Sequence, residues 1–405
     1  MANNDMFKPP AERAAPAPTQ AAFSGSLRAI DYLEHTQTVA PSLVRANRQQ
    51  EPVEAAPLLN SAAPAAAPLD ATEPDAVEDV IMMMPTIAAP QAAGSRHAFV
   101  PPAAAPTKRR AQRGLKGALA RAGLPLAPSA ADLANQLESE AADADVNTIR
   151  QATWSRAVGI LVANRKGGVG KTPTSLVIGG ILASIRGGSV SVLEVSDDPG
   201  ALEFRAEGVP TIGLGELVRD AASINSAGQL AGYTALQSSF ASVIGTVGRR
   251  ERLSREAVSA TTALLDRFYA IRVMDSGNQP TSDAFAGAVE AADVLVIPIF
   301  EAGDAVLGAV ALLEELSAAG EAGAVLARRA IVLRIADGRP VPAGVKTRVD
   351  ASLVPLNLAG VFEIPFDAHI AERGDITLSK LAPATYRAFT AAAAAIVRVL
   401  TTHVR

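Results

Sequence analysis

The order of apolar segments in this 405-residue chain predicts a doubly wound α/β domain, with helices on both faces of a mostly parallel sheet. Three observations support this fold class. Short apolar runs alternate with stretches of helical periodicity, a glycine-rich loop joins the first run to a helix, and a glycine pair ends that helix. Alternating strands and helices imply parallel pairing with crossover helices. Ligands of such sheets bind at the carboxyl ends of the strands.

The N-terminal 106 residues differ in composition from the rest of the chain. They hold more than half of the 27 prolines, mostly within alanine-rich tracts. Ala and Pro offer little apolar area to offset chain entropy, so we expect residues 1–106 to be a disordered arm. Residues 27–35 and 75–84 are small apolar islands in this arm. They are candidate docking motifs, although tails also contain such islands without partners.

A linker of residues 107–149 follows the arm and is basic first and then acidic. Residues 107–126, TKRRAQRGLKGALARAGLPL, contain six cations and no acid, with apolar residues at helical spacing. This segment could be a solvated face, a DNA contact or a contact with an anionic membrane surface. Residues 132–149 predict an acidic helix that leads into the folded domain, which we place at residues 150–405.

Composition excludes several classes of protein. The chain has no cysteine, which excludes disulfides, thiolate metal sites and iron–sulfur clusters and favours a reducing cytoplasm. The N-terminus MANNDMFKPP lacks the order of a signal peptide, and no apolar run has the length of a membrane span. The net charge of −4 is too small to name a partner. We therefore expect a cytoplasmic protein.

Six apolar runs predict the strands of the sheet. They are residues 157–164, 189–195, 270–274, 293–299, 330–335 and 360–364. Helical patterns separate them, notably at residues 304–319 and 385–400. The helix after the first strand should end at Gly187 and Gly188, because glycine adopts a left-handed cap without side-chain strain.

The loop between the first strand and its helix reads NRKGGVGKTPTS, residues 164–175. The usual phosphate-binding pattern is GxxxxGK[ST], and its first glycine would fall on Arg165. The deviant pattern KGGxGK[ST] matches at every position, from Lys166 through Gly167, Gly168, Val169, Gly170 and Lys171 to Thr172. In such loops backbone amides and a helix N-terminus bind phosphates, the lysine reaches the outer phosphates and the hydroxyl binds Mg2+.

With this loop the sequence resembles the ParA/MinD family of P-loop ATPases, from about Ala157 to the C-terminus. The resemblance implies ATP or ADP and Mg2+ as ligands, with residues 166–173 around the phosphates. It also implies that Lys166, the extra lysine, reaches across an ATP-bound homodimer to the phosphates of the other subunit. A cation that is supplied only on dimerisation makes dimer and transition state depend on ATP.

Further segments match the family in the expected order. Asp275 ends the third predicted strand before Ser276, Gly277 and Asn278, and the resemblance implies that it helps to hold Mg2+ together with Thr172. Residues 291–300, AADVLVIPIF, and 364–371, IPFDAHIA, are similar to two later family segments. The second would border the adenine pocket, with Pro365 as its contact.

The chain departs from the family pattern at two places. Family members follow the second strand with DxD, whose second acid orients the attacking water; aligned by strand end, this chain has Ser196 there. Either Asp198 takes over from a slightly longer loop, or hydrolysis is slow, because serine is no base near neutral pH without activation. We favour Asp198 as the catalytic acid, beside Lys166 and Lys171. Pro173 replaces a second threonine and is tolerated in the first turn of a helix.

The resemblance implies an ATPase that drives DNA partition or cargo positioning in a bacterial cytoplasm, in association with the nucleoid. Its expected partners are nonspecific DNA and a stimulating ParB-like or cargo adaptor protein that binds the N-terminal arm. A membrane is a weaker candidate, because the alanine-rich C-terminus carries few cations. A secretion-associated MinD-like ATPase and a nucleotide-gated scaffold remain alternatives. Further candidate DNA contacts are Arg328, Arg329, Arg334, Arg339, Lys346 and Arg348.

Overall fold

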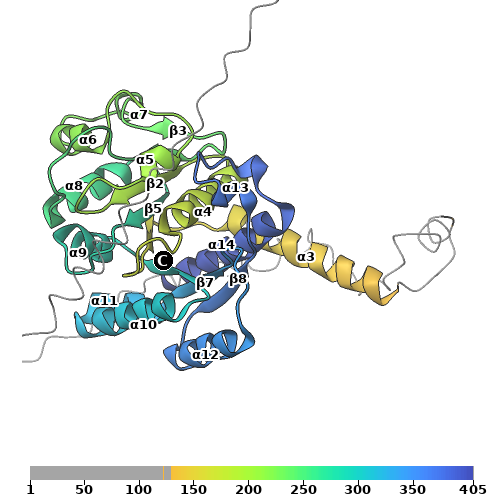
Figure 1. Cartoon of the computed structure of the whole chain (residues 1–405). Helices are drawn as coiled ribbons and strands as arrows, with labels where there is room; N and C mark the ends of the chain where they lie inside the picture. The colour runs from red at the N-terminus through yellow and green to blue at the C-terminus, as the bar shows by residue number, and fades with distance from the viewer. Residues whose placement is uncertain (1–121, 123–128, 405) are drawn as a thin grey trace, which may run out of the picture. The chain divides into compact units, whose positions relative to one another are not determined.

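A computed structural model describes residue 122 and residues 129–404, which contain an eight-stranded sheet between two layers of helices (Figure 1). This confirms the predicted doubly wound α/β class. The expectations for the arm and, apart from residue 122, for the basic segment at 107–126 concern residues outside this description.

Seven of the eight strands run parallel, and one edge strand is antiparallel to its neighbour. The strand order across the sheet is β3-β4-β2-β5-β1-β6-β7-β8. The strands are β1 (Val158–Val162), β2 (Val190–Val195), β3 (Ala235–Leu236), β4 (Ser242–Ile244), β5 (Ile271–Ser276), β6 (Val294–Phe300), β7 (Ile331–Ile335) and β8 (Gly360–Ile364). Because β1 lies between β5 and β6, the loop that follows it is at the point where the chain changes direction across the sheet.

The six predicted strands are all present, and the sheet has two more that the sequence analysis missed. These are β3 and β4, of two and three residues. Runs this short carry no readable periodicity. They form because β4 pairs in parallel with β2 and β3 folds back onto β4. The sheet therefore extends one hairpin beyond the predicted edge.

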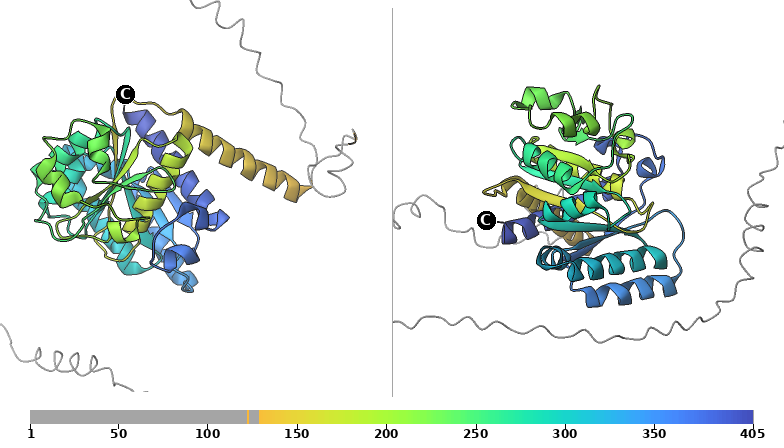
Figure 2. Two further views of the ribbon diagram at one scale, coloured as in Figure 1. Left: turned by 90° about the horizontal axis from the view of Figure 1, so that it is seen from above. Right: turned by 90° about the vertical axis from the view of Figure 1, so that its left-hand side faces the viewer.

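Helices cover both faces of the sheet, as the views in Figure 2 show. One layer contains α3 (Ala130–Gln151), α4 (Lys171–Arg186) and α14 (Pro383–His403). The other contains α6 (Leu214–Asp220), α8 (Arg255–Leu265), α9 (Asp283–Glu290), α10 (Gly303–Ala318), α11 (Glu321–Arg328) and α12 (Ala343–Leu353). Shorter helical elements are α5 (Leu202–Arg205), α7 (Ala227–Ala231), η2 (Val354–Leu356), α13 (Ala368–Ala371) and η3 (Leu378–Lys380).

The strands bury both faces because their side chains alternate between the two helical layers. In β1, Ile160 packs with the layer of α4 and α14, while its neighbour Leu161 packs with the layer of α8 to α11. Both are fully buried. This explains why the strands read as continuous apolar runs.

The acidic helix that was expected at the end of the linker, residues 132–149, is α3. Ser129 caps its N-terminus through the amide of Asp132, in a capping box. Its last turns pack against α14 and α4, and Ile149 is fully buried there. The other end of the helix extends away from the sheet (Figure 1). No helix among the described residues is long and apolar enough to cross a membrane.

The helix after β1 begins and ends at glycines. Gly170, with φ 91°, precedes α4, and Gly187, with φ 77°, ends it in the left-handed conformation that the sequence predicted. In the middle of α4, Gly179 lies against the sheet, where a Cβ would come 2.4 Å from Val192. This close approach fixes the helix, and therefore its N-terminus, over the carboxyl ends of the central strands.

Candidate functional site

The loop of residues 164–170 connects β1 to the N-terminus of α4. Gly168 and Gly170 have φ values of 75° and 91°, which disfavour any side chain, and a Cβ on Gly168 would meet no atom within 4 Å. The first amides of a helix have no intrahelical acceptor, and their dipole favours an anion. The loop therefore offers an open, amide-lined approach to the start of α4.

Lys171 is the first residue of α4 and is buried in this loop. Its Nζ donates hydrogen bonds to the carbonyl of Asn164 at 3.1 Å, to the carbonyl of Lys166 at 3.2 Å and to Oδ1 of Asn278. Burial lowers the pKa of this amine to about 8, against the opposing effect of Asp275. The ammonium is thus bound by three neutral oxygens of the site. Phosphate oxygens of a ligand could replace them as its acceptors.

Thr172 and Asp275 form the second polar group of the site. The Thr172 hydroxyl donates to Oδ2 of Asp275 at 2.7 Å, and Ser175 donates to Oδ1 at 3.1 Å. Burial raises the pKa of Asp275 to about 6, although both hydroxyls favour its charged form. Asp275 is the last residue but one of β5, so a strand and a helix bring the two predicted metal ligands together.

This donor set fits Mg2+ bound with a nucleotide. Mg2+ favours one or two protein oxygens and takes its other ligands from water and phosphates. Thr172 and Asp275 supply two adjacent oxygens. No cluster of three or more His, Asp or Glu residues that could hold a metal alone is present in residues 129–404. The residues present therefore suit a metal that arrives with phosphates.

Lys166 differs from Lys171 in exposure and in its partners. Its side chain is 48% exposed, and Nζ pairs with Oδ2 of Asp304, near the start of α10, at 2.8 Å. Asp304 is itself exposed, so the pair lies in solvent, where such contacts contribute little. The two lysines of one loop therefore face inward and outward.

Pro173 and Pro365, the two prolines predicted to contact the nucleotide, lie in the first turn of α4 and directly after β8. Pro173 is the third residue of α4, in the first turn, and the amide of Thr174 still bonds to Gly170. Pro365 directly follows β8 and is exposed. Ile335, at the end of the neighbouring β7, approaches Gly170 to within 3.2 Å of where a Cβ would stand. The end of β7 thus lies beside the loop, and that of β8 beside β7.

The predicted catalytic acid is on the loop that follows β2, residues 196–200. The Asp198 carboxylate is 66% exposed and lies 3.5 Å from Nε of Arg252. Ser196 lies beside Gly277, which follows β5, since a Cβ on Gly277 would be 3.2 Å from that of Ser196. This loop and the Asp275 strand end are therefore neighbours.

The side chains that hold these loops were not among the residues predicted from the sequence. Asn164 donates to the carbonyl of Pro298 and accepts from the amide of Lys166, which fixes the start of the glycine loop. Glu194 and Arg250 form an ion pair whose side chains are both 1% exposed. Asn164 could have been noticed because it directly precedes the motif. Nothing in the sequence links Glu194 to an arginine 56 residues away.

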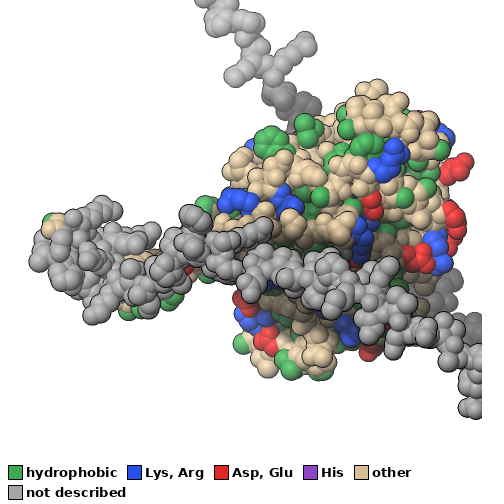
Figure 3. Space-filling view, turned by 180° about the vertical axis from the view of Figure 1, so that it is seen from behind, with side chains coloured by type: hydrophobic (Ala, Val, Ile, Leu, Met, Phe, Trp, Pro, Cys, Tyr) green, Lys and Arg blue, Asp and Glu red, His purple; other side chains and the backbone are tan. Residues whose placement is uncertain are grey.

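Three of the six candidate DNA contacts within the domain form ion pairs with acidic side chains. Arg334 is buried, pairing with Glu301, Asp350 and Glu363, so its proposal as a DNA contact is wrong. Its side chain is only 7% exposed, so a large ligand cannot reach its guanidinium. Arg339 pairs with Asp337 and Lys346 with Glu363. On the face shown in Figure 3, basic and acidic side chains lie close to one another.

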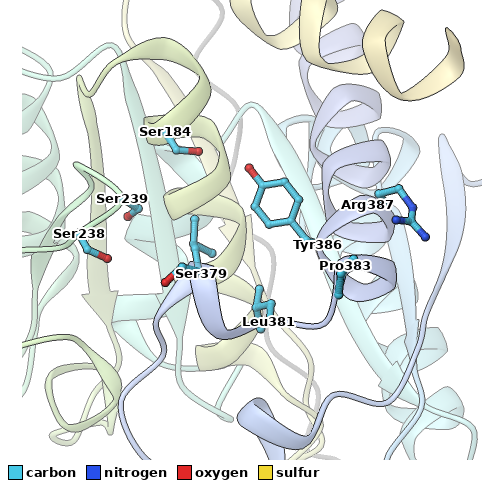
Figure 4. A pocket seen from close by; sticks show the side chains of 9 residues that line it. Ser184, Ser238, Ser239, Ser379, Leu381, Pro383, Tyr386 and Arg387 are labelled. Atoms are coloured by element: carbon cyan, nitrogen blue, oxygen red, sulfur yellow. The ribbon is translucent and has the colours of Figure 1, made fainter. Parts of the chain in front are cut away.

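A separate pocket of about 580 Å³ opens beside the C-terminal part of α4 (Figure 4). The ring of Tyr386 points toward Ser184 across it. Ser184 is 13 residues from Lys171 along α4, which places the pocket about 20 Å from the glycine loop at a rise of about 1.5 Å per residue. Its lining is Ser184, Ser238, Ser239, Leu378, Ser379, Leu381, Pro383, Tyr386 and Arg387.

Comparisons with known proteins give matches among solved structures only; no family model and no curated protein matches the chain. A ParA family ATPase from Chlorobium tepidum is 17% identical with a TM-score of 0.49, covering 61% of this chain and 98% of its own. Cyanothece McdA in an ATP complex is 17% identical with a TM-score of 0.44, covering 59% and 95%. MinD from Aquifex aeolicus is 17% identical with a TM-score of 0.41, covering 58% and 95%. Both names in the predicted resemblance, ParA and MinD, are thus among the structures to which this chain is similar.

Proposed function

We propose that this chain is an ATP-dependent dimerisation switch, which hydrolyses ATP to drive partition of DNA or positioning of another cargo. The observation that carries the proposal is the opposite placement of two lysines in one loop. Lys171 is buried against its own loop, whereas Lys166 is half-exposed and its Nζ pairs with the exposed carboxylate of Asp304. A lysine at that position is available to the phosphates of a second subunit.

Each group of the site has a defined task in this proposal. Loop amides and Lys171 bind the phosphates, while Thr172 and Asp275 hold Mg2+, which neutralises phosphate charge when bound. Asp198 orients the attacking water from the loop after β2, and Pro365 borders the adenine. Lys166 completes the site of the partner, so that a subunit alone hydrolyses ATP poorly.

Light scattering with size exclusion tests the switch directly. Wild type, Lys166→Ala and Arg165→Ala are compared with ADP, ATP and a nonhydrolysable ATP analogue. We expect wild type to dimerise with ATP or the analogue and Lys166→Ala to remain monomeric while still binding nucleotide. Arg165→Ala is the matched control, because Arg165 also pairs with an exposed acid, Glu315. A protein that stays monomeric in every condition would contradict the switch.

Nonspecific DNA is the proposed surface on which the dimer acts. Three of the six candidate cations in the domain form ion pairs, so the proposal relies on the six cations of residues 107–126. If all six contact phosphates, the logarithm of affinity should fall with that of salt concentration at a slope of about −5. Fluorescence anisotropy of a duplex at several salt concentrations measures this slope. Anionic liposomes in the same samples separate DNA from membrane.

The proposed stimulating partner is an adaptor protein that binds the arm. Its support is compositional, since residues 75–84 join acids to three methionines within the arm. Removal of residues 1–106 should leave basal turnover unchanged and abolish stimulation by a bound adaptor. Phosphate release with and without the arm measures both quantities.

A nucleotide-gated scaffold is the second candidate function, and Ser196 favours it. A serine at the expected second acid and an exposed Asp198 are compatible with an ATP-bound dimer that barely turns over. Phosphate release from the wild-type dimer distinguishes this scaffold from the ATPase. A secretion-associated ATPase would share the same ATP chemistry, so it differs only in the partner that stimulates it.

A further inference from the structure

The loop after β2 is held by a buried ion pair that lies outside the nucleotide-binding motif. Glu194 belongs to β2, and Arg250 lies on the segment between β4 and α8. Arg250 Nη2 is 2.9 Å from Glu194 Oε1, and both side chains are only 1% exposed. A buried ion pair often stabilises a fold no more than apolar residues of the same volume would. We therefore look for its role in the hydrogen bonds that it makes to the loop.

Most of the hydrogen bonds that Arg250 donates go to the loop after β2. Its guanidinium bonds to three successive carbonyls, those of Ser196 at 2.6 Å, Asp197 at 2.6 Å and Asp198 at 3.1 Å. Its Nε donates to the Thr246 hydroxyl at 2.7 Å. A planar fork with five donors can hold several acceptors at fixed angles, which an ammonium cannot do.

Glu194 closes the same loop from its far end. Its Oε1 accepts from the amide of Gly200 at 3.0 Å and from the Thr246 hydroxyl at 2.6 Å. Arg250 therefore binds the loop at residues 196–198, and Glu194 binds it at residue 200. We call Glu194, Thr246 and Arg250 the loop clamp.

The clamp also accounts for the serine at position 196. The Ser196 hydroxyl donates to the Asp198 carbonyl at 2.6 Å and lies 3.3 Å from Glu194 Oε1. A carboxylate at this position would meet the buried Glu194 carboxylate, and like charges repel strongly there. Of the two aspartates in this loop, Asp198 is exposed and Asp197 is half-buried, so Asp198 is the acid that is more open to water.

We propose that Arg250 is a positioning residue for ATP hydrolysis, which fixes the backbone of residues 196–200 so that Asp198 can orient the attacking water. The proposal rests on the proposed ATPase function. In this role Arg250 acts through the loop backbone, whose carbonyls its guanidinium contacts directly. A small displacement of a catalytic group can reduce turnover about 100-fold, so a rigid loop matters more for rate than for binding.

The test is a double-mutant cycle with Asp198. Wild type, Arg250→Lys, Asp198→Asn and the double variant are assayed for phosphate release and for affinity of a fluorescent ATP analogue. We expect Arg250→Lys to lower kcat about 10-fold or more and to change nucleotide Kd less than about two-fold. In the Asp198→Asn background, Arg250→Lys should alter kcat less than two-fold, because the carboxylate that Arg250 positions is no longer there.

Arg272→Lys is the matched control for a merely structural effect. Arg272 is also a buried arginine in an ion pair, with Asp266, but its strand position opposes Gly159 near the other end of the sheet. We expect its variant to lower thermal stability without separating kcat from Kd and without coupling to Asp198. Hydrogen exchange at residues 196–200 should rise in Arg250→Lys and stay unchanged in Arg272→Lys.

Each outcome decides the proposal. If Arg250→Lys fails to fold, Glu194→Gln with Arg250→Met removes the clamp without leaving a buried charge, and the same loss of kcat is expected. Unchanged kcat, equal losses in both Asp198 backgrounds, or unchanged hydrogen exchange would overturn the positioning role alone. A wild type that binds ATP and releases no phosphate overturns it as well. Failure of wild type to bind ATP overturns the proposed function.

Discussion

The loops after β1 and β2 meet at the same edge of the sheet, yet they are held in different ways. The loop after β1 depends on its own residues, because glycines with positive φ shape it and its own carbonyls hold Lys171. The loop after β2 depends on Arg250, which approaches from a distant segment and binds three of its carbonyls. A glycine loop can be read from sequence, and a clamped loop cannot.

The two loops also differ in the groups that they present to a ligand. The loop after β1 presents backbone amides, and conformation alone determines where these point. In our proposal the loop after β2 presents a side chain, Asp198, from five residues that belong to no helix or strand. Such a loop needs outside contacts to hold one conformation, and the loop clamp provides them.

Removing Glu194 should produce the largest effect on stability. Glu194→Ala leaves Arg250 buried without its counter-ion, which costs about 3–5 kcal/mol of unfolding free energy. Urea unfolding followed by circular dichroism measures it. Glu315→Ala removes an exposed glutamate from an ion pair with Arg165 and should cost less than about 1 kcal/mol. Similar losses in both variants would show that the clamp is no more important than a surface pair.

Glu203, in α5 just beyond the clamped loop, should make stability depend on pH. Glu203 is 6% exposed, and its carboxylate lies near the backbone amide of Gly245. Burial raises its pKa to about 7, with an opposing bond from the Gly245 amide and a further rise from Glu194. The folded state then binds the proton more tightly than the unfolded state. This stabilisation is complete below about pH 4.5 and is lost as pH rises through about 7.

Glu203→Gln removes that dependence. Between pH 4.5 and pH 8 the ionisation of Glu203 should lower the unfolding free energy of the wild type by at most about 3 kcal/mol. The variant has no ionisable group at this position and should not show this loss. At pH 8 the variant should therefore be the more stable protein, and near pH 4.5 the two should be similar. Denaturant unfolding at a series of pH values gives both curves. Parallel curves would show that Glu203 is not buried as described.

A change in the loop after β1 should have a smaller effect on stability. Gly170→Ala places a side chain at φ 91°, and its Cβ would lie 3.2 Å from Ile335. An L-residue in this conformation costs about 1–2 kcal/mol. Gly303→Ala is the control, because no atom lies within 4 Å of its Cβ position and its φ is not positive. Thermal unfolding compares the two, and equal melting temperatures would contradict the strain.

Much of the site could be predicted from sequence because it is local. Residues 166–172 are contiguous, and Asp275 directly follows an apolar run, so strand and helix assignments place them at one edge. The hairpin of β3 and β4 was missed because runs of two and three residues carry no period. Arg334 was misassigned as a DNA contact because one cation in a sequence does not reveal the acids that fold around it.

The sequence by itself determined the α/β class, the deviant glycine loop and the presence of two lysines in it, because backbone conformation and apolar periodicity are properties of neighbouring residues. Only the tertiary structure decided that Lys171 faces inward and Lys166 outward, and that Glu194 and Arg250 hold the loop that carries Asp198. Burial and ion pairing depend on segments that meet only in the folded chain. Pairs of residues 56 positions apart leave no pattern along it.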